Sequence, residues 1–552
     1  MSDDGADATI AERLRAAEPT GELPIGGLAD RLEMAGLLRG AWAGGRAASI
    51  AALAGLAVRG VAYDSRRVGP GSLFVAVPGA HADGHDYVRA AAAAGAVAAV
   101  VERPVDGAPL PQLVVERSRS ALAAAASWWY GDPSRSLGVV GVTGTDGKTT
   151  TSFLAAAVLE AAGIPAGLVG TAETRIGPQR EPNAEHVTTP EAPELQAMLR
   201  AMVDAGDRGA VVETTSHGLA LERVGGVAYD VGILTNLSHE HLELHGTFAA
   251  YRAAKASLFE RLATGPANLP KELGRPWPRT GIVNRDDPSW AFFAAAIERA
   301  GARLVTYGTD AGAAVRALAV EEDARRLRVA VVTPRWEGRV ELRLAGRFNV
   351  HNALAAAALG EALDLDPATI RAGLESVAGV PGRMERVEAG QPFGVIVDYA
   401  HSPAALEKVL GLLAPLAAAR GGGLVAVFGS AGERDTAKRP MMGRIAGERC
   451  RLVVVTDEDP RGEDRLAILD EIAAGAEAAG RRRGADLLLI PDREAAIAAA
   501  LERARPGDLV LLAGKGHERS IIMADGPHPW DERAAAIRRL AGLGFGGSGT
   551  DG

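Results

Sequence analysis

The sequence is poor in cysteine and lacks long apolar runs, and each shortage excludes a class of protein. Cys450 is the only cysteine among 552 residues, which excludes internal disulfides and thiolate metal clusters and indicates a reducing, cytoplasmic setting. The alanine-rich stretch 90–101 is too short to span a membrane. The acidic beginning MSDDGADATI lacks the basic and apolar regions of a signal peptide. We therefore expect a cytoplasmic protein without membrane insertion.

Positive charge and aromatic residues are also scarce. The chain has 60 Lys and Arg against 69 Asp and Glu, a net charge of −9, which argues against nonspecific nucleic-acid binding. Aromatic residues make up only 4%, whereas hydrophobic residues at 47% and charged residues at 23% are ordinary for globular proteins. A chain of this length is expected to form roughly three or four domains.

The most informative stretch is GVVGVTGTDGKTTTS at 138–152, where an apolar run ends in a glycine-rich turn. Gly144 and Gly147 allow backbone N–H groups to face a triphosphate, Lys148 supplies a positive charge, and Thr149 offers a hydroxyl to Mg²⁺. The following helix would direct its N-terminus at the phosphates. Val142 stands where the strict pattern has glycine, so this is a variant loop. A simple strand-to-helix turn would not account for GKTTT.

Short apolar runs alternate with alanine-rich stretches and predict βα units with buried, mostly parallel strands. We predict an α/β fold with a central P-loop parallel-sheet domain and a C-terminal Rossmann-like domain. The predicted divisions are a mobile tail 1–20, three domains at 21–135, 136–380 and 381–540, and a disordered tail 541–552. The predicted strands include Leu73–Val77, Ala96–Val101, Leu137–Val142, Ala210–Val212, Val231–Leu234, Val395–Val397, Leu424–Phe428, Arg451–Thr456, Leu487–Ile490 and Leu509–Ala513.

Two further segments suit a metal ion. Glu213 directly follows an apolar run, and carboxylates at strand ends face the ligand crevice of open α/β sheets. The segment TNLSHEHLELH places His239, His241 and His245 close together. Zinc is one interpretation. Mg²⁺ with oxygen ligands and one imidazole suits a nucleotide site better. Solvated loop histidines remain the alternative without a ligand.

Several long motifs occur in an order that resembles the Mur ligases of peptidoglycan synthesis, most closely the MurE type. The resemblance covers residues 60 to 540. It implies a cytoplasmic ligase that uses ATP and Mg²⁺ to add the third amino acid to UDP-N-acetylmuramoyl-L-alanyl-D-glutamate. It also implies a monomer. The motifs are GTDGKTTT, TTPEAPEL, ETTSHGL, TNLSHEHLELHGTFAAYRAAKASLF, GRFNVHN, PGRMERV, DYAHSPAALE and GKGHE.

The resemblance assigns catalytic roles to Lys148, Glu213, His241 and Lys255. It also implies that Mg²⁺ is held by Thr149, Glu213, His241 and a carbamylated Lys255. Carbamylation converts this cation into a carboxylate-like ligand, which a hard cation prefers. Without the resemblance, Lys255 would be taken for an ordinary exposed lysine on a helix.

Three binding groups follow from the same resemblance. The ATP-binding residues are Gly144, Thr145, Asp146, Gly147, Lys148, Thr149, Thr150, Asn349, Asn352, Arg383 and Asp398. The UDP-sugar and dipeptide contacts are Tyr63, Ser65, Ala80, His81, Ala82, Thr188, Thr189, Thr215 and Arg223. The incoming amino acid would meet Arg434, Glu458, Asp459, Arg461, Gly514 and Glu518.

The chain departs from the family pattern at Glu458 and Asp459 and at Asp146. Diaminopimelate-adding members usually read DNPR where this chain has Glu458, Asp459, Pro460 and Arg461. Arg461 suits the second carboxylate of meso-diaminopimelate, whereas Asp459 adds a negative charge that would favour lysine or ornithine. We favour diaminopimelate because the arginine is kept. Asp146 stands where the family commonly has asparagine, which places a carboxylate beside the phosphates.

The implied reaction transfers the γ-phosphoryl group to the D-glutamate side chain, and the amine of a free diamino acid then attacks the acyl phosphate. A folylpolyglutamate synthetase-like ligase is one alternative, but that class lacks the segment 63–88. A P-loop kinase would not need a third domain, and a GTPase would carry an NKxD segment that we do not find. A regulatory homologue would be expected to lose Lys148, Glu213, His241 or Lys255.

Overall fold

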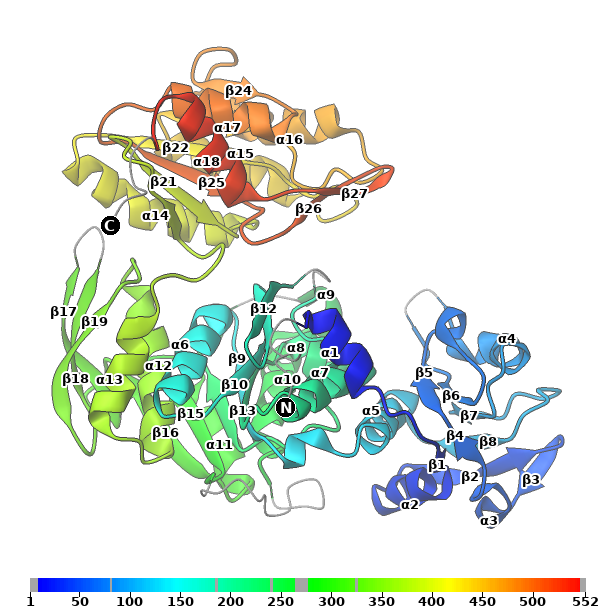
Figure 1. Ribbon diagram of the computed structural model, residues 1–552. Coiled ribbons are helices and arrows are strands. Elements are labelled where there is room, and N and C mark those ends of the chain that lie inside the picture. The colour runs from blue at the N-terminus through cyan, green and yellow to red at the C-terminus, as the bar shows by residue number, and fades with distance from the viewer. Residues whose placement is uncertain are drawn as a thin grey trace.

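The computed structural model describes residues 8–79, 82–183, 187–238, 242–263, 277–322 and 326–546. Within these ranges the chain forms three domains, each built on its own large sheet (Figure 1). The sheets have six, eleven and six strands in chain order, and helices cover them. The predicted three-domain α/β fold is therefore confirmed. None of the described helices combines the length and apolarity that crossing a membrane requires.

The N-terminal sheet has the order β3-β2-β8-β7-β6-β5. Strands β5 to β8 are parallel, and β2 joins β8 antiparallel. Its core packs against α5, which also contacts α7 of the central domain. The elements are α2 (Gly26–Met34), β2 (Leu38–Ala43), β3 (Arg46–Ala48), α3 (Ile50–Leu53), β5 (Gly60–Ala62), β6 (Ser72–Val75), α4 (Val88–Ala93), β7 (Ala98–Val101), β8 (Gln112–Val115) and α5 (Ser118–Trp129), with the small pair β1 (Leu23–Pro24) and β4 (Ala57–Val58).

The central sheet has the order β12-β11-β10-β13-β9-β14-β15-β16-β17-β18-β19. Its middle strands are parallel, as predicted, whereas both edges are antiparallel. The strands are β9 (Gly138–Thr143), β10 (Ala166–Val169), β11 (Glu173–Ile176), β12 (Gln179–Pro182), β13 (Gly209–Glu213), β14 (Val231–Leu234), β15 (Thr280–Asn284), β16 (Arg303–Gly308), β17 (Val315–Glu322), β18 (Leu327–Val332) and β19 (Glu337–Leu342).

Helices cover both faces of this sheet. One core joins α6, α12 and α13 to the sheet, and the other joins α7, α10 and α11. Glycine permits a close contact between α13 and α6, because a Cβ on Gly373 would lie 2.6 Å from the Cα of Val158. The helices are α6 (Lys148–Ala161), α7 (Ala192–Asp204), α8 (Ser216–Ala220), α9 (Leu242–His245), α10 (Phe248–Glu260), α11 (Trp290–Arg299), α12 (Phe348–Ala362) and α13 (Pro367–Ser376).

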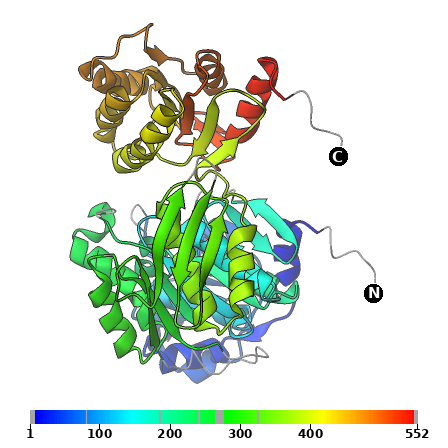
Figure 2. The ribbon, with the colours of Figure 1, turned by 90° about the vertical axis from the view of Figure 1, so that its left-hand side faces the viewer.

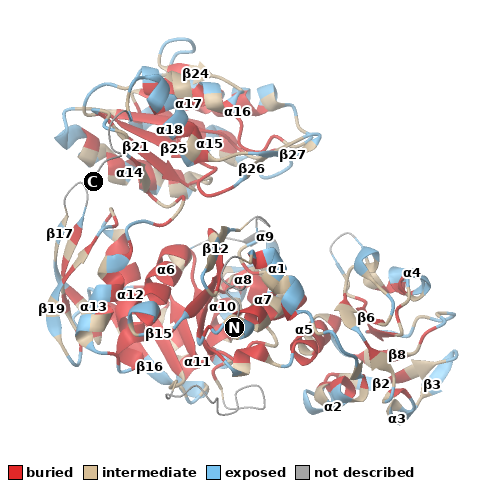
Figure 3. Cartoon of the chain, in the orientation of Figure 1, coloured by how far each residue is buried: buried red, intermediate tan, exposed pale blue. Residues whose placement is uncertain are grey.

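The C-terminal sheet has the order β20-β21-β25-β22-β23-β24, parallel except for the edge strand β20. Helices α14 to α16 pack on one face and α17 and α18 on the other, the arrangement of a doubly wound fold. Figure 3 shows buried strands between helices whose outer sides are exposed. The elements are β20 (Glu385–Val387), β21 (Gly394–Asp398), α14 (Pro403–Ala419), β22 (Leu424–Phe428), α15 (Lys438–Arg449), β23 (Leu452–Val455), α16 (Arg465–Ala478), β24 (Leu487–Leu489), α17 (Arg493–Glu502), β25 (Leu509–Ala513), β26 (Ser520–Met523), β27 (Gly526–Pro529) and α18 (Glu532–Gly542).

Both ends of the chain differ from the predicted tails. Helix α1 (Ile10–Ala17) begins with a capping box between Thr9 and Glu12 and buries Ile10 and Ala17 on the central domain. Near the other end, the ring of Phe545 meets Phe393 edge-to-face at 5.9 Å. The predicted tails are therefore wrong for these residues, because a few apolar side chains anchor segments that are otherwise polar or glycine-rich.

The two domain boundaries stay predictions. Residue 135 ends the short 3-10 helix Pro133–Arg135, and residue 380 lies between α13 and β20. Figures 1 and 2 both show the C-terminal domain on one side of the central domain, across this second connection.

Candidate active site

The glycine-rich loop between β9 and α6 has a backbone that only glycine fits. Gly147 precedes the helix with φ of 80°, in the left-handed region. Gly144 has φ of 146°, and a Cβ there would lie 1.8 Å from Oγ1 of Thr235. The loop thus turns tightly against the end of β14 and opens onto the N-terminus of α6, where an anion is favoured.

The end of β14 fixes the loop through hydrogen bonds. The N–H of Thr145 donates to the carbonyl of Asn236 at 2.8 Å. Thr235 Oγ1 and Asn236 Nδ2 both donate to the carbonyl of Asp146, at 2.6 and 3.1 Å. The Asp146 N–H in turn donates to Asn236 Oδ1 at 3.0 Å. The backbone of this loop is therefore preorganised by its neighbouring strand.

Two lysines converge on the loop. Lys148 Nζ donates to the carbonyls of Gly144 and Thr145 at 3.0 and 2.7 Å. Lys255 Nζ, from α10, donates to the same Gly144 carbonyl at 2.8 Å. Lys255 is only 1% exposed and lies 4.7 Å from the ring centroid of Tyr251. The reading of Lys255 as an ordinary exposed lysine is thus wrong, and the position expected from the family resemblance lies beside the phosphate loop.

Glu213 lies at the end of β13, next to this loop, and is completely buried. Its carboxylate accepts hydrogen bonds from Thr149 Oγ1 at 3.1 Å, from the Thr171 N–H at 3.0 Å and from Thr171 Oγ1 at 2.9 Å. Thr149 and Glu213 thus bring hydroxyl and carboxylate oxygens together beside the phosphate loop. Hard oxygen donors of this kind suit Mg²⁺.

The histidine part of the expected metal site is not placed. His239 and His241 lie outside the described residues, whereas His245 packs 5.4 Å from Tyr251, ring centroid to centroid. The described ranges contain no group of three His, Cys, Asp or Glu that could hold a metal ion. The magnesium set of Thr149, Glu213, His241 and modified Lys255 therefore remains a proposal.

The expected dipeptide contacts adjoin Glu213. Thr188 Oγ1 lies 3.0 Å from Thr171 Oγ1, and Thr189 Oγ1 donates to the Glu213 carbonyl at 2.8 Å and lies 3.0 Å from Thr215 Oγ1. These hydroxyl groups thus form a continuous polar wall beside the buried carboxylate.

Arg223 joins the same wall from the segment that follows α8. Its Nη1 donates to the Thr189 carbonyl at 3.0 Å, and its Nε pairs with Glu191 at 2.8 Å. Part of the guanidinium is therefore already engaged, so a substrate carboxylate would have to share this arginine with Glu191.

The expected adenosine contacts come from two domains. Asn352 of α12 accepts from Thr151 Oγ1 at 3.2 Å and donates to Asn349 at 2.9 Å. A Cβ on Gly147 would lie 2.4 Å from Asn352 Oδ1, so α12 abuts the loop directly. Thr150, on the first turn of α6, is also buried.

Arg383 and Asp398 approach from the C-terminal domain. Arg383 Nη2 lies 3.5 Å from Thr149 Oγ1, across the domain junction. Asp398 accepts from the N–H groups of Met384 and Ala400 at 2.8 and 2.9 Å. Burial raises the pKa of the Asp398 carboxyl, and the nearby Arg383 opposes this shift. The two residues thus lie where a nucleotide on the loop would meet the C-terminal domain.

A further ion pair crosses the junction and was not anticipated. Lys408 Nζ on α14 lies 3.0 Å from Asp146 Oδ2 on the phosphate loop, and both side chains are about half exposed. The carboxylate that replaces the family's usual asparagine at position 146 is therefore paired with the Lys408 cation.

The N-terminal domain places its expected residues around a short 3-10 helix, Ser65–Arg67, and a nearby loop. Tyr63 reaches the central domain and donates from its hydroxyl to Glu194 at 3.2 Å. Burial, followed by the charges of Glu194 and Glu191, raises the pKa of Tyr63. The Ala82 carbonyl accepts from the Gly79 N–H at 2.8 Å, whereas Ala80 and His81 lie outside the described residues.

The expected amino-acid pocket lies at the strand ends of the C-terminal sheet. Lys515 is completely buried, and its Nζ lies 2.7 Å from Asp459 Oδ1 and 2.5 Å from Glu518 Oε2. The negative charge of Asp459 is therefore partly balanced within the protein. Lys515 lies in the GKGHE motif between the predicted pocket residues Gly514 and Glu518, but no role was predicted for Lys515 itself.

Glu458 adds a buried carboxylate beside this cluster. It is 6% exposed, and its Oε2 atom has no hydrogen-bond partner among the described residues. A Cβ on Gly514 would lie 3.0 Å from that oxygen. Arg461 has φ of 55° and donates its N–H to Ile522 at 2.9 Å, and Arg434 is exposed. The structure thus brings Glu458, Asp459, Gly514 and Glu518 together.

Arg493 also stabilises the backbone around this pocket, and the sequence analysis did not predict a role for it. The Arg493–Glu532 pair is completely buried, with Nη2–Oε1 at 2.7 Å. The same guanidinium donates to the carbonyls of Asp457 and Ala513 at 2.8 and 2.7 Å. These carbonyls immediately precede Glu458 and Gly514 in the chain, so Arg493 ties together the two segments that carry them.

Comparison with known proteins accounts for this arrangement. Three Mur ligase regions match in chain order: the family's catalytic domain at residues 57–130, the middle domain at 142–360 and the glutamate ligase domain at 382–516. UDP-N-acetylmuramyl-tripeptide synthetase from Roseiflexus sp. (strain RS-1) is 51% identical, covering 89% of this chain and 96% of that protein. The chain belongs to the Mur ligase family.

Two further relatives have names that specify 2,6-diaminopimelate. UDP-N-acetylmuramoyl-L-alanyl-D-glutamate–2,6-diaminopimelate ligase from Geobacter metallireducens is 42% identical, covering 89% of this chain and 96% of that protein. A solved structure of a ligase with the same name superimposes with a TM-score of 0.60 at 28% identity, covering 89% and 96% of the two chains. The likeness therefore extends over all three domains.

Proposed function

We propose that this protein is an ATP-dependent ligase that adds the third amino acid to UDP-N-acetylmuramoyl-L-alanyl-D-glutamate in the cytoplasm. The observation that carries the proposal is the grouping of Lys148, Thr149, Glu213 and Lys255 around one phosphate loop that faces a second domain. The names of the relatives from Roseiflexus and Geobacter support the substrate.

In this proposal Lys148 and the N–H groups of the loop bind the phosphates and balance charge on the γ-phosphoryl group during transfer. Thr149, Glu213, His241 and carbamylated Lys255 would hold Mg²⁺, which would supply positive charge to offset the negative charge of the phosphates. Thr149 and Glu213 fit this role because their oxygens lie 3.1 Å apart beside the loop.

The threonine wall and Arg223 would orient the D-glutamate carboxylate toward the transferred phosphoryl group. The C-terminal pocket would then present the amine that attacks the acyl phosphate, which releases inorganic phosphate. Arg383 would help to hold the two domains together, because its Nη2 lies 3.5 Å from Thr149 Oγ1. Closure of the two domains would exclude water from the reactive acyl phosphate.

For the third amino acid we propose meso-diaminopimelate. The argument for lysine or ornithine rested on the extra negative charge of Asp459, and Lys515 opposes that charge at 2.7 Å. The family resemblance assigns Arg434 and Arg461 to amino-acid binding. Two arginines suit diaminopimelate, because this amino acid has two carboxylates. The name of the Geobacter relative specifies diaminopimelate, whereas that of the Roseiflexus relative leaves the amino acid open.

The decisive experiment measures phosphate release from ATP with each substrate omitted in turn. We expect release only when the UDP-muramoyl-dipeptide and a diamino acid are both present, and a competition among diaminopimelate, lysine and ornithine should yield the diaminopimelate product. Release with glutamate and a folate in their place would favour the folylpolyglutamate alternative. Release with the dipeptide alone would contradict coupled amide formation.

A further inference from the structure

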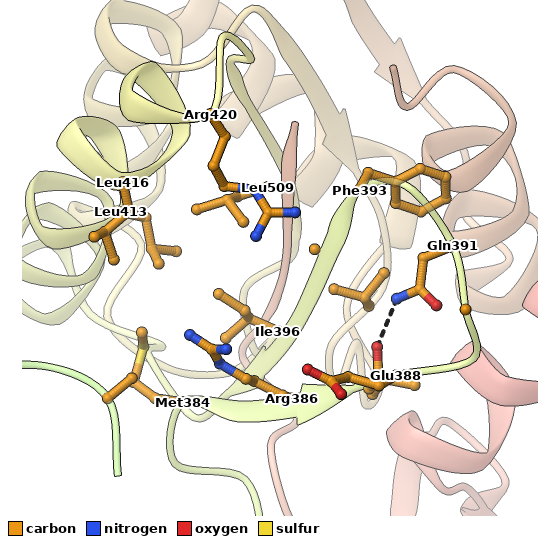
Figure 4. Close-up of a pocket in the computed structure, with 15 residues that line it drawn as sticks. Met384, Arg386, Glu388, Gln391, Phe393, Ile396, Leu413, Leu416, Arg420 and Leu509 are labelled. Carbon is orange, nitrogen blue, oxygen red and sulfur yellow. Dashed lines mark hydrogen bonds between the residues drawn. The ribbon is translucent and has the colours of Figure 1, made fainter. Parts of the chain in front are cut away.

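The C-terminal domain contains a cavity of about 180 Å³ between the edge strand β20, strand β21 and helix α14 (Figure 4). Its floor is apolar and includes the buried side chains of Ile396, Leu413 and Leu509. An apolar cavity of about 150 Å³ is large enough to hold a benzene molecule. The space is therefore sufficient for one small ring or a short acyl chain.

Two arginines from different elements line this cavity. Arg386 belongs to β20, and Arg420 caps the C-terminus of α14. Figure 4 shows the Arg420 guanidinium beside Leu509 and the Arg386 guanidinium beside Ile396. The Arg420 backbone N–H donates to the Ala417 carbonyl at 3.0 Å, whereas its side chain forms no hydrogen bond or ion pair with the described part of the chain. Glu388 at the rim is the one carboxylate among the lining residues, so positive charge is in excess.

Arg420 is exposed, so its guanidinium is hydrated beside the cavity and is accessible to a ligand that also covers the apolar floor. A ligand with an apolar body and one carboxylate satisfies both parts of the cavity. Its ring or chain would cover the floor, and its two oxygens match the planar fork of a guanidinium. We propose that this cavity is a binding site for a small organic carboxylate with a single ring or short acyl chain.

The site is separate from the proposed catalytic machinery but shares backbone with it. Met384 lines the cavity and directly follows Arg383, and its N–H donates to Asp398 at 2.8 Å. Strand β21 has Val395 and Ile396 at the cavity and Asp398 at its end. An occupant would therefore contact the two segments that present Arg383 and Asp398 to the nucleotide side.

Benzoate tests the proposal on the full chain, with binding followed by ligand-observed nuclear magnetic resonance. We expect a dissociation constant of about 1 mM, which is reasonable for a ligand of this size. Benzamide keeps the ring without the charge, and acetate keeps the charge without the ring. Both should bind at least about tenfold more weakly than benzoate, a difference of about 1.4 kcal/mol.

Two variants change the cavity and two leave it intact. Arg420→Gln removes the exposed cation, and Leu416→Trp fills the cavity from its half-buried rim. Each should weaken benzoate binding at least about tenfold. Arg444→Gln is the matched control, because Arg444 is an exposed arginine that pairs with Glu448 on α15. Arg461→Gln is the control for the proposed amino-acid pocket, which would also attract carboxylates.

The proposal fails if Arg461→Gln abolishes benzoate binding or if ATP displaces benzoate competitively, because the probe would then occupy a substrate site. It also fails if benzamide binds as well as benzoate, or if Arg420→Gln and Leu416→Trp, each shown to unfold at the temperature of the unsubstituted protein, bind benzoate normally. These measurements involve no turnover, so their outcome is independent of the proposed ligase activity.

Discussion

Different interactions fix the shape of the phosphate loop and that of the proposed amino-acid pocket. The loop is one contiguous segment whose shape follows from Gly144, Gly147 and hydrogen bonds to the end of β14. The pocket combines the ends of β23 and β25 with the segment before β26, and buried ion pairs join them. The first site depends on local backbone geometry, whereas the second depends on charges that must find each other during folding.

We expect the largest effect from a substitution that removes the positive charge at the loop and leaves both loop glycines in place. Lys148→Ala should lower phosphate release by at least about 10²–10³-fold, because it removes a preorganised cation from the transferring phosphoryl group. Lys148 is half-buried and its Nζ donates to the carbonyls of Gly144 and Thr145, so the melting temperature should fall, but by far less than would account for the loss of activity. Coupled ADP release measures the effect, and retained turnover would contradict the proposed role.

Substitutions of Lys255, which also lies beside the phosphate loop, test whether this lysine is carbamylated. Lys255→Ala should lower activity by about 10²-fold or more, since the loss resembles that of a metal ligand or its supporting contact. If a carboxylate is what the site requires, formate or acetate should restore part of the activity. Lys255→Arg, which keeps a cation and cannot be carbamylated in the same way, should be inactive and should not respond. Equal activity of Lys255→Arg and the unsubstituted protein would contradict carbamylation.

Arg493 tests the other region. Arg493→Met leaves Glu532 as a lone buried carboxylate, and breaking such a pair costs about 3–5 kcal/mol. Hydrogen exchange should therefore accelerate in β23 and β25, while binding of ADP to the phosphate loop should persist. The double variant Arg493→Met with Glu532→Leu should recover part of the protection, because it removes both charges. Unchanged exchange in Arg493→Met would show that the pair does not hold the two segments.

The smallest expected effect concerns the contact that links the two regions. Lys408→Met leaves the Asp146 carboxylate unpaired beside the phosphates and should raise KM for ATP by up to about fivefold, since exposed pairs contribute about 0.2–1 kcal/mol. Adding Asp146→Asn should restore KM, and both effects should shrink at high salt. An equal increase in the presence and absence of Asp146 would show that Lys408 acts on the nucleotide directly.

The sequence predicted the buried parallel strands well, because contiguous residues determine them, and it also located the glycine-rich loop between β9 and α6. Strands β17 to β19 were not predicted, because none of them is a fully apolar run. In each of these strands buried residues are interspersed with more exposed ones. Arg493 and Lys515 could not be predicted as buried, because such residues are usually exposed and only their distant partners explain them. The roles of all the predicted site residues stay predictions, and Ala80, His81 and His241 lie outside the described residues.

The position of β9 in the middle of the central sheet has a consequence for synthesis of the chain. Strand β9 is paired on both sides, with β13 and β14, which leave the ribosome later. The face of α6 that carries buried side chains is covered by α12 and α13, which emerge later still. A nascent chain therefore exposes an apolar strand and an apolar helix until residue 376 has been made, so we expect chaperone binding to begin with β9 and to end with α13.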